Sequence, residues 1–345
     1  MALKELIKEA RKKIESAKNP LYFYDDDPDG LSSFLILMRA FKKGYGVPVK
    51  RNDEGQVSVY ISKIDEKNPD LVVTLDKPMV TQDIIDQINV PVIIVDHHPV
   101  NDVKGAKYIN PRIYDDKDNR PTTYWAYKIA DEPEDSNWIA ATGIVADYFL
   151  PEDDFMKKFK YRELIGNSKS PAEALYEHEI GILVKVLSFI QKGRTSEVRK
   201  YANLMLGIKS PYEILRQESE AGKNIWKKYL GVNKEYESLL KKALGSNDDG
   251  KLLVFNYQTS SASLTGVLSN ELLYRCKSKV IIVARANKDR MLISLRSKGP
   301  KIEPVLREVL KITGGSGGGH DYACGANIDK GDFEKFVELI RKGII

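Results

Sequence analysis

Three short apolar runs in the first hundred residues each end on an aspartate. They are "LYFYD" (21–25), "LVVTLD" (71–76) and "VIIVD" (92–96), and they are nearly continuous in apolar residues. Such runs are typical of parallel strands that are covered on both faces. They predict an α/β fold whose parallel sheet brings the carboxyl ends of all strands to one edge, where ligands bind.

The rest of the chain divides into segments of different character. "QVSVYIS" (56–62) is predicted as a further strand, and helices are predicted around 32–46, 121–131 and 135–150. Residues 151–245 are helical in pattern, and His178 is expected in the middle of an amphipathic helix there. "GSNDDGK" (245–251) is a linker, and a second, smaller α/β unit follows it. The predicted domains are 1–150, 151–245 and 246–345.

Composition narrows the cellular setting and the kind of ligand. No stretch reaches the roughly 18 apolar residues of a membrane helix, the N-terminal helix has no apolar signal core, and there are two cysteines. We therefore expect a cytoplasmic protein without a membrane partner. The net charge of +5 lies entirely in 246–345, where 16 Lys and Arg face 11 Asp and Glu. A solvated basic face accounts for this excess, and so does a region that handles an anion.

The aspartates at the strand ends are expected to converge in space. Asp25 and Asp76 each end a run, and Asp96 is followed by His97 and His98. A single aspartate at a strand end is often only the N-cap of the next helix. Three such ends together, one of them Asp-His-His, favour a functional site instead.

Asp147, in the apolar segment "GIVADYFL", is a further candidate because a lone charge has no evident structural use there. Asp25, Asp27 and Asp29 alternate, so their side chains would point the same way in an extended segment and Asp26 would point away. Carboxylates with one or two imidazoles suit Mn²⁺ or Mg²⁺. The number of carboxylates is enough for two ions about 3.5–4 Å apart.

Four ordered motifs, "DDDPDG", "TLDKP", "VDHHP" and "GIVADY", resemble those of the DHH phosphoesterase superfamily. "GGSGGGHDYACG" (314–325) is similar to the Gly-Gly-Gly-His signature of its DHHA1 domain. The resemblance implies a DHH metal-binding catalytic domain, a helical connector and a DHHA1 substrate-binding domain, with the active-site cleft between the two domains. Phe23 stands where some members have histidine, so this chain resembles the Asp-x-Asp-x-Asp version of RecJ-like nucleases, and its helical insert is similar to that of archaeal ones.

The resemblance also implies residue roles. The metal ligands of the family match Asp25, Asp27, Asp29, Asp76, His97 and Asp147. Asp76 would bridge both ions, Asp96 would orient the ring of His97, and His98 would face the phosphate and stabilise its developing charge. Asp76, Asp96 and His98 are accordingly the predicted catalytic residues. Cys324 is expected to be a small packing residue.

The glycine-rich segment in the C-terminal unit is predicted to clamp the substrate. Backbone N–H groups of "GGSGGG" can form an anion nest, although a flexible linker is the alternative for a glycine run. Ser260, Ser261 and Ser263 are further contacts or equally helix caps. The predicted substrate-binding residues are Arg296, Ser297, Gly317, Gly318, Gly319, His320 and Ser261.

Together these features predict a Mn²⁺-dependent phosphodiesterase, with Mg²⁺ as a second choice of ion. The resemblance implies a RecJ-like exonuclease that hydrolyses single-stranded RNA or DNA from an end, and the small net charge favours short oligonucleotides over a long footprint. A cyclic-dinucleotide or phosphoadenosine-phosphate phosphodiesterase is the alternative among enzymes. A RecJ-related replisome scaffold is the alternative from another class, but such relatives usually lose motif aspartates that are all present here. A homodimer and replication or repair proteins remain open as partners.

Overall fold

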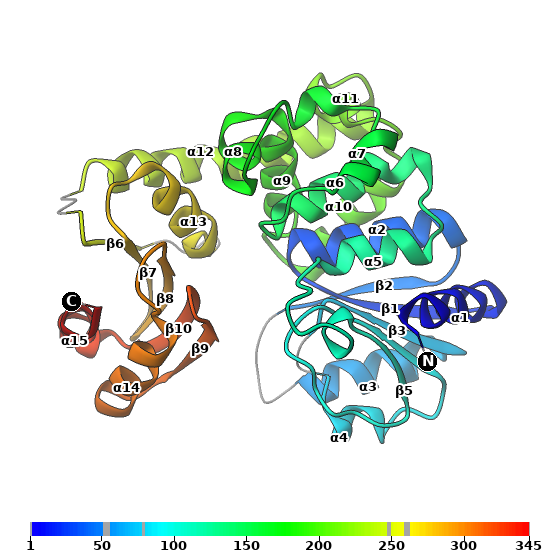
Figure 1. Ribbon diagram of the computed structural model, residues 1–345, viewed down its shortest axis with the longest axis horizontal. Helices are drawn as coiled ribbons and strands as arrows, with labels where there is room; N and C mark the ends of the chain where they lie inside the picture. Colours follow the sequence, from blue (N-terminus) through cyan, green and yellow to red (C-terminus); the bar gives the residue numbers. More distant parts are fainter. Residues whose placement is uncertain (1, 51–55, 78–79, 247–249, 259–262, 345) are drawn as a thin grey trace. The chain divides into compact units, whose positions relative to one another are not determined.

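The computed structural model describes residues 2–50, 56–77, 80–246, 250–258 and 263–344. They form two compact units, Met1–Tyr229 and Leu230–Ile345, which are described separately below (Figure 1). The division falls inside the long helix α12 (Glu220–Leu244). Within the described ranges no helix combines the length and the apolar character that a bilayer crossing requires.

The first unit is built around a parallel sheet of order β2-β1-β3-β4-β5. Its strands are β1 (Pro20–Asp25), β2 (Tyr45–Val49), β3 (Leu71–Leu75), β4 (Val92–Val95) and β5 (Ala106–Ile109). Its first helices are α1 (Leu3–Ser16), α2 (Pro28–Phe41), α3 (Gln56–Lys67), α4 (Gln82–Ile85), α5 (Thr122–Ile129) and α6 (Asn137–Ala146), with 3₁₀ turns η1 (Pro111–Ile113) and η2 (Glu134–Ser136).

Alternating residues of β1 pack against opposite layers, which explains why the strand is apolar throughout. Leu21 and Phe23 join the core beneath α3 and α4, where Phe23 meets the ring of Tyr60 at 4.5 Å. Tyr22 and Tyr24 face the other way and pack against Phe34 of α2. The three predicted strands and the sheet covered on both faces are therefore confirmed (Figure 1).

Three predictions for this unit need correction. "QVSVYIS" forms helix α3 rather than a strand, because Tyr60 and Ile64, four residues apart, face the same core. The helix predicted over 32–46 ends at Phe41, and its last two residues belong to strand β2 (Tyr45–Val49), whose position at the sheet edge tolerates Pro48. Strand β5, only half buried, lies at the opposite edge and was not predicted.

Helices continue the first unit after α6, as predicted for 151–245. They are α7 (Asp153–Lys158), α8 (Pro171–Glu177), α9 (Glu179–Ile190), α10 (Thr195–Leu206) and α11 (Pro211–Leu215), with the 3₁₀ turn η3 (Arg162–Leu164), before α12 begins. The helix expected through His178 is broken there, because His178 has extended backbone angles and separates α8 from α9. His178 instead packs beside Gly166, whose missing side chain leaves room for the imidazole.

The second unit holds a sheet of order β6-β7-β8-β10-β9, parallel between β6 and β7 and antiparallel elsewhere. Its elements are β6 (Leu252–Gln258), α13 (Thr265–Arg275), β7 (Val280–Asn287), β8 (Arg290–Ser297), α14 (Glu303–Thr313), β9 (Ser316–His320), β10 (Ala323–Asp329), η4 (Lys330–Asp332) and α15 (Phe333–Ile344). Helices α14 and α15 pack over one face, with Leu306 and Phe336 against Ile282 and Ile293. The second α/β unit is thereby confirmed. Cys324 is buried in this core, as expected.

The glycine-rich segment differs from the predicted loop. Residues 316–320 form the edge strand β9, which pairs with β10 in antiparallel register from Ser316↔Asn327 to His320↔Ala323. All five residues of β9 are nevertheless exposed. Glycine is needed at two of them, since a Cβ at Gly317 or Gly319 would lie 2.6 or 2.3 Å from a carbonyl oxygen of β10.

Candidate metal centre

The carboxyl ends of β1, β3 and β4 carry the acidic residues of the site. Asp25 is the last residue of β1, Asp76 follows β3, and Asp96 follows β4. The three side chains are at most 2% exposed. Because these strands are neighbours and parallel, residues up to 71 positions apart in the chain meet at one edge of the sheet.

The first motif is not the extended segment that its alternating aspartates suggested. Asp27 caps α2 by accepting a hydrogen bond from the Gly30 amide at 2.9 Å, and Asp29 already lies in the first helical turn. Pro28 suits the first position of a helix. Gly30 lets the helix start directly on the strand, since a Cβ there would come within 2.6 Å of the Asp25 backbone nitrogen. A strand end, a cap and a first turn thus present the three carboxylates.

Asp29 is held by the N-terminus of α5, a contact that sequence analysis missed. Its two carboxylate oxygens accept hydrogen bonds from the backbone amides of Thr122, at 2.9 Å, and Thr123, at 2.7 Å. The Thr122 hydroxyl also donates to Asp76 Oδ1 at 3.1 Å. One helix end therefore orients a carboxylate from the first turn of α2 and another from the end of β3. No motif in the sequence marks this contact, because it joins residues 93 apart through backbone atoms.

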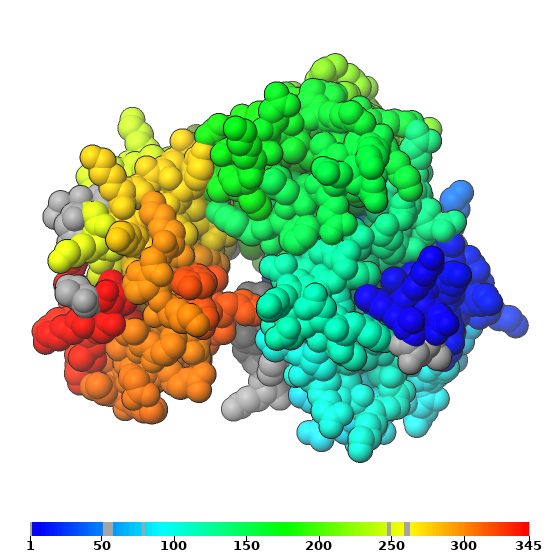
Figure 2. Space-filling view, viewed as in Figure 1, coloured from blue at the N-terminus to red at the C-terminus, as the bar shows by residue number. Residues whose placement is uncertain are grey.

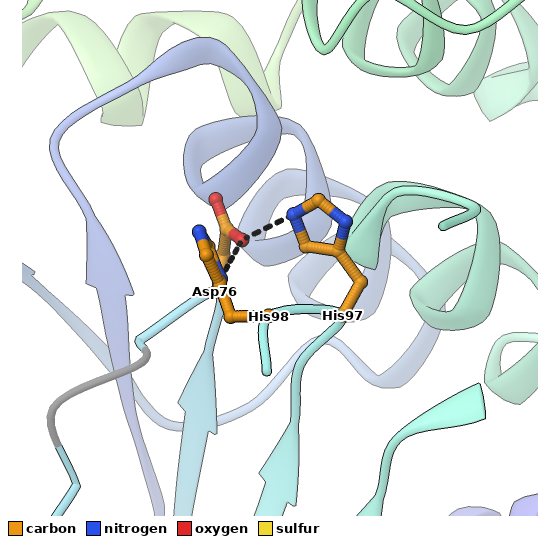
Figure 3. A group of neighbouring side chains, drawn as sticks. All are labelled: Asp76, His97 and His98. Atoms are coloured by element: carbon orange, nitrogen blue, oxygen red, sulfur yellow. Dashed lines mark ion pairs between the residues drawn. The ribbon is translucent and has the colours of Figure 1, made fainter. Parts of the chain in front are cut away.

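Asp76 lies between the two histidines (Figure 3). Its Oδ1 is 3.5 Å from His97 Nε2 and 3.7 Å from His98 Nδ1. Its backbone is in the left-handed region, with φ of 59°, and its amide donates to Val95 O. This conformation costs energy for a residue other than glycine, and such strain is typical of functional positions.

The histidine that Asp96 orients is His98 rather than His97. Asp96 Oδ1 lies 2.8 Å from His98 Nδ1, and the Tyr108 hydroxyl donates to Asp96 Oδ2 at 3.4 Å. Asn110 fixes the same segment by donating to the His98 carbonyl. The predicted pairing of Asp96 with the ring of His97 is corrected accordingly. Asp96 therefore fixes the orientation of the His98 ring through Nδ1.

Asp147 completes the cluster from the C-terminal end of α6. Its Oδ2 lies 3.6 Å from His97 Nε2, which in turn lies 3.9 Å from Asp29 Oδ2. Three groups of side chains each bring one donor atom per residue within 4.8 Å: Asp76, His97 and His98; Asp29, His97 and Asp147; and Asp25, Asp27 and Asp76. Every predicted metal ligand belongs to one of these groups, and Asp76 and His97 each belong to two.

The ionisable side chains of this cluster have shifted pKa values because they are buried close to one another. Burial, together with the charge of Asp147, raises the pKa of Asp29 to about 7. Burial and the neighbouring aspartates, Asp29 first, raise the pKa of Asp76 well above its usual value. Burial lowers the pKa of His97, but Asp147 and Asp29 outweigh it and the net shift is upward. Carboxylates that repel one another in a buried site, with imidazole nitrogens among them, form a donor set that fits divalent cations such as Mn²⁺ or Mg²⁺.

Lys77 was overlooked in the "TLDKP" motif. Its ammonium group is buried and donates to Asp25 Oδ1 at 3.0 Å and to Val49 O at 3.2 Å. It therefore offsets the charge of one of the acids before any metal binds. A lysine directly behind a strand-ending aspartate was the available signal, although a surface lysine is far more common than a buried one.

The predicted substrate residues lie in the second unit. Arg296 in β8 donates to Asn270 Oδ1 and to Ser294 Oγ, at 2.5 and 3.0 Å, so its guanidinium is already oriented. The Ser297 hydroxyl donates to Pro300 O and accepts from the Gly299 amide, within its own turn. Ser261 lies outside the described residues. Gly317, Gly318, Gly319 and His320 all lie in β9.

An open hollow of about 460 Å³ borders the end of β9. Its lining residues are Glu303, Arg307, Gly319, His320, Asp321, Tyr322 and Ala323. Arg307 is the arginine on its walls and is paired with Glu303, and Asp321 adds a second carboxylate. The charges of the hollow therefore do not single out a phosphate.

Two family descriptions match successive parts of this chain. "DHH family, N-terminal domain" matches residues 21–164, and "DHHA1 domain" matches residues 249–344. The chain belongs to the DHH/DHHA1 superfamily. The matched DHH region contains every candidate metal ligand, and the matched DHHA1 region contains Arg296 and β9.

The fold is similar to that of RecJ from Thermus thermophilus, whose structure was solved in complex with Mn²⁺. The TM-score is 0.73, with 17% identity over 99% of this chain. This chain spans 54% of that one. An exonuclease RecJ bound to manganese gives a TM-score of 0.68 at 16% identity, covering 100% of this chain and 94% of that one. The pGpG-specific phosphodiesterase PggH from Vibrio gives 0.52 at 12%, covering 95% and 99%. No curated protein sequence matches the chain. Domain content and fold support a DHH-family phosphoesterase.

Proposed function

We propose that this protein is a Mn²⁺-dependent phosphodiesterase that hydrolyses single-stranded RNA or DNA from an end, including short oligonucleotides. The observation that carries the proposal is the set of three donor groups that share Asp76 and His97 at one buried sheet edge. Shared ligands allow two ions to bind close together, which is the arrangement used for in-line phosphoryl displacement. When bound, such ions activate water and offset the charge that develops on the phosphoryl oxygens.

The protein's own side chains have distinct tasks in this proposal. Asp76 and His97 contribute to two donor groups each, and the α5 N-terminus keeps Asp29 and Asp76 oriented. His98 is held through Nδ1 by Asp96, and in this proposal it acts as an imidazolium whose Nε2–H donates a hydrogen bond to the scissile phosphate as negative charge grows there. Asp96 is thus a positioning residue that acts through His98.

The second unit would bind the strand on which the first unit acts. The preoriented Arg296 and the exposed backbone of β9 are suited to phosphate oxygens. One RecJ neighbour is an exonuclease by name, and PggH is by name specific for the dinucleotide pGpG, which supports linear strands down to dinucleotide length. Homodimerisation and contacts with replication or repair proteins remain predictions.

The test is to incubate the protein with end-labelled RNA and DNA, from dinucleotides to strands of about 30 nucleotides, with Mn²⁺ or with EDTA. We expect stepwise release of mononucleotides in Mn²⁺ alone. Asp76→Asn should lower kcat/KM by about 10³-fold or more, because it removes a ligand shared by two donor groups. Asparagine is the suitable replacement since it tolerates the left-handed backbone at this position.

Asp83→Asn is the matched control, since Asp83 lies in α4 of the same unit, outside the three donor groups, and should leave the rate unchanged. Cleavage of cyclic dinucleotides or of phosphoadenosine phosphate, with no linear strand cut, would replace the proposed substrate class. No cleavage of any substrate despite bound Mn²⁺ would reject the hydrolase and favour the scaffold.

A further inference from the structure

Helix α6 ends in a Schellman motif directly after a candidate metal ligand. The Phe149 amide donates to Ile144 O at 3.2 Å, and the Tyr148 amide donates to Val145 O at 3.1 Å. In this motif the residue after the C-cap Asp147 must adopt the left-handed conformation, and Tyr148 does so with φ of 60°. The chain turns sharply here, so Asp147 is left facing His97.

Tyrosine is an unfavourable residue at this position. Glycine is the usual one, because a Cβ in the left-handed region crowds the following carbonyl. Tyr148 is 42% exposed, so burial of its ring offsets little of the energy cost of this backbone conformation. Strain that is kept at a functional site points to a role for the side chain.

The surroundings of Tyr148 indicate what that role is. Asp147 Oδ2 lies 3.6 Å from His97 Nε2, and consecutive Cα atoms are about 3.8 Å apart, so the backbone of Tyr148 lies directly beside a candidate metal ligand. The Tyr148 hydroxyl lies 3.5 Å from the hydroxyl of Tyr176 in α8. Tyr148, at the end of the helix that carries Asp147, and Tyr176, in α8, therefore form an aromatic pair whose first member is the chain neighbour of a candidate metal ligand.

We propose that Tyr148, supported by Tyr176, is a base-stacking subsite for the nucleotide whose phosphate is at the metal centre. The inference rests on the proposed function, since it names a substrate contact of that same site. Stacking on a tyrosine ring needs no particular base, because every base has a π-face. The subsite belongs to the first unit and is separate from the phosphate contacts expected of the second.

The test measures strand binding and thermal stability of the full chain in parallel. Fluorescence anisotropy with a labelled six-nucleotide strand, in Ca²⁺ to slow hydrolysis, gives Kd for the wild type, Tyr148→Gly and Tyr148→Phe. We expect Tyr148→Gly to weaken binding by about 5- to 100-fold, the range measured for loss of one base–aromatic stack. Tyr148→Phe keeps the ring and should bind within about 2-fold of the wild type.

Two further readouts separate stacking from a structural role. Glycine relieves the backbone strain, so Tyr148→Gly should keep or raise Tm, by up to about 4 °C. The second readout uses strands in which one terminal base at a time is replaced by an abasic site. For the wild type, one of these replacements should weaken binding relative to the intact strand. For Tyr148→Gly, the intact strand and that abasic strand should bind equally well.

Tyr148→Gly could instead lower Tm and keep the wild-type ratio between the Kd values of the intact and abasic strands. That result would show that the ring only packs within the protein and would overturn the subsite. Equal affinity of the wild type and Tyr148→Gly would do the same. If the wild type binds and cleaves no strand at all, the proposed function fails instead, so the two failures are distinguishable.

Discussion

The metal centre and the β9 strand carry the two groups of predicted functional residues, and they are built in opposite ways. The metal centre collects side chains from β1, α2, β3, β4 and α6, and Asp25, Asp29, Asp76 and Asp96 are at most 2% exposed. Strand β9 is one continuous segment at a sheet edge, and all of its residues are exposed. The segment that contains β9 is coloured red-orange in Figure 2.

The difference teaches which changes each region can tolerate. In the metal centre, Asp25, Asp29 and Asp76 accept hydrogen bonds from partners that are distant in sequence. Removing one such partner leaves a buried carboxylate without its support. In β9 the functional atoms are backbone groups, and what matters is the absence of side chains. Chemistry is therefore expected to depend on the first region, and substrate affinity on the second.

Thr122→Val should produce the largest effect among changes outside the ligands themselves. The substitution removes the hydroxyl that donates to Asp76 Oδ1 but keeps the backbone amide that donates to Asp29. Loss of such a supporting hydrogen bond typically weakens metal binding by about 10- to 100-fold. Titration of Mn²⁺ by calorimetry measures the change.

Thr313→Val is the control for this substitution. Thr313 is also buried, and its hydroxyl donates to Val309 O in α14, in the other unit. Equal Mn²⁺ affinity in the wild type and Thr122→Val would mean that the α5 N-terminus does not position the site, and the contrast between the two regions would lose its basis.

The metal-free protein should become less stable as the pH rises from 5 to 8. The pKa of Asp29 is raised to about 7 in the folded state and is near 4 in the unfolded state. Between these two values the folded protein keeps Asp29 protonated and the unfolded chain does not, so the free energy of unfolding falls as the pH rises to about 7. The raised pKa of Asp76 and the raised pKa of His97 act in the same direction. Between pH 5 and pH 7 the loss from Asp29 alone is on the order of 3 kcal/mol, seen as a lower Tm at pH 8 than at pH 5 in EDTA.

Saturating Mn²⁺ should reverse this trend, because metal binding needs the deprotonated carboxylates and strengthens as the pH rises. Asp29→Asn should flatten the profile in EDTA. A Tm in EDTA that rises steadily between pH 5 and 8 would contradict the charge balance described for the metal centre.

The sequence was sufficient to predict which residues lie at the strand ends, but not the hydrogen bonds that hold those residues in place. The convergence of Asp25, Asp76 and Asp96 followed from parallel-sheet geometry alone, since equivalent strand ends must share an edge. The order of the motifs then named Asp147, although its distance from His97 could come only from the structure.

What sequence could not supply were contacts through the backbone or across long loops. Backbone amides such as those of Thr122 and Thr123 can bind a carboxylate whatever their side chains are, so the sequence pattern does not reveal them. The burial of Lys77 depends on β2, which was not predicted, because its ammonium group donates to Val49 O. Strand β2 was itself missed, because its edge position admits Tyr-Gly-Val-Pro-Val where a central strand would not. The glycine signature was predicted as an anion nest or a flexible linker and not as a strand, yet close packing on β10 requires glycine there.

Gly318→Ala should give the smallest effect and tests the β9 half of the comparison. A Cβ at Gly318 would have no atom within 4 Å, unlike one at Gly317 or Gly319, so the fold and Tm should be unchanged. If a phosphate approaches this backbone, the added methyl group should raise KM by about 10-fold, the loss expected for one hydrogen bond to a charged group. The value of kcat should stay the same, because the metal centre is untouched. Gly331→Ala, in the same unit and equally unhindered, should change neither constant. A lower kcat at unchanged KM in Gly318→Ala would mean that β9 takes part in the chemical step, and the division of labour between the two regions would be wrong.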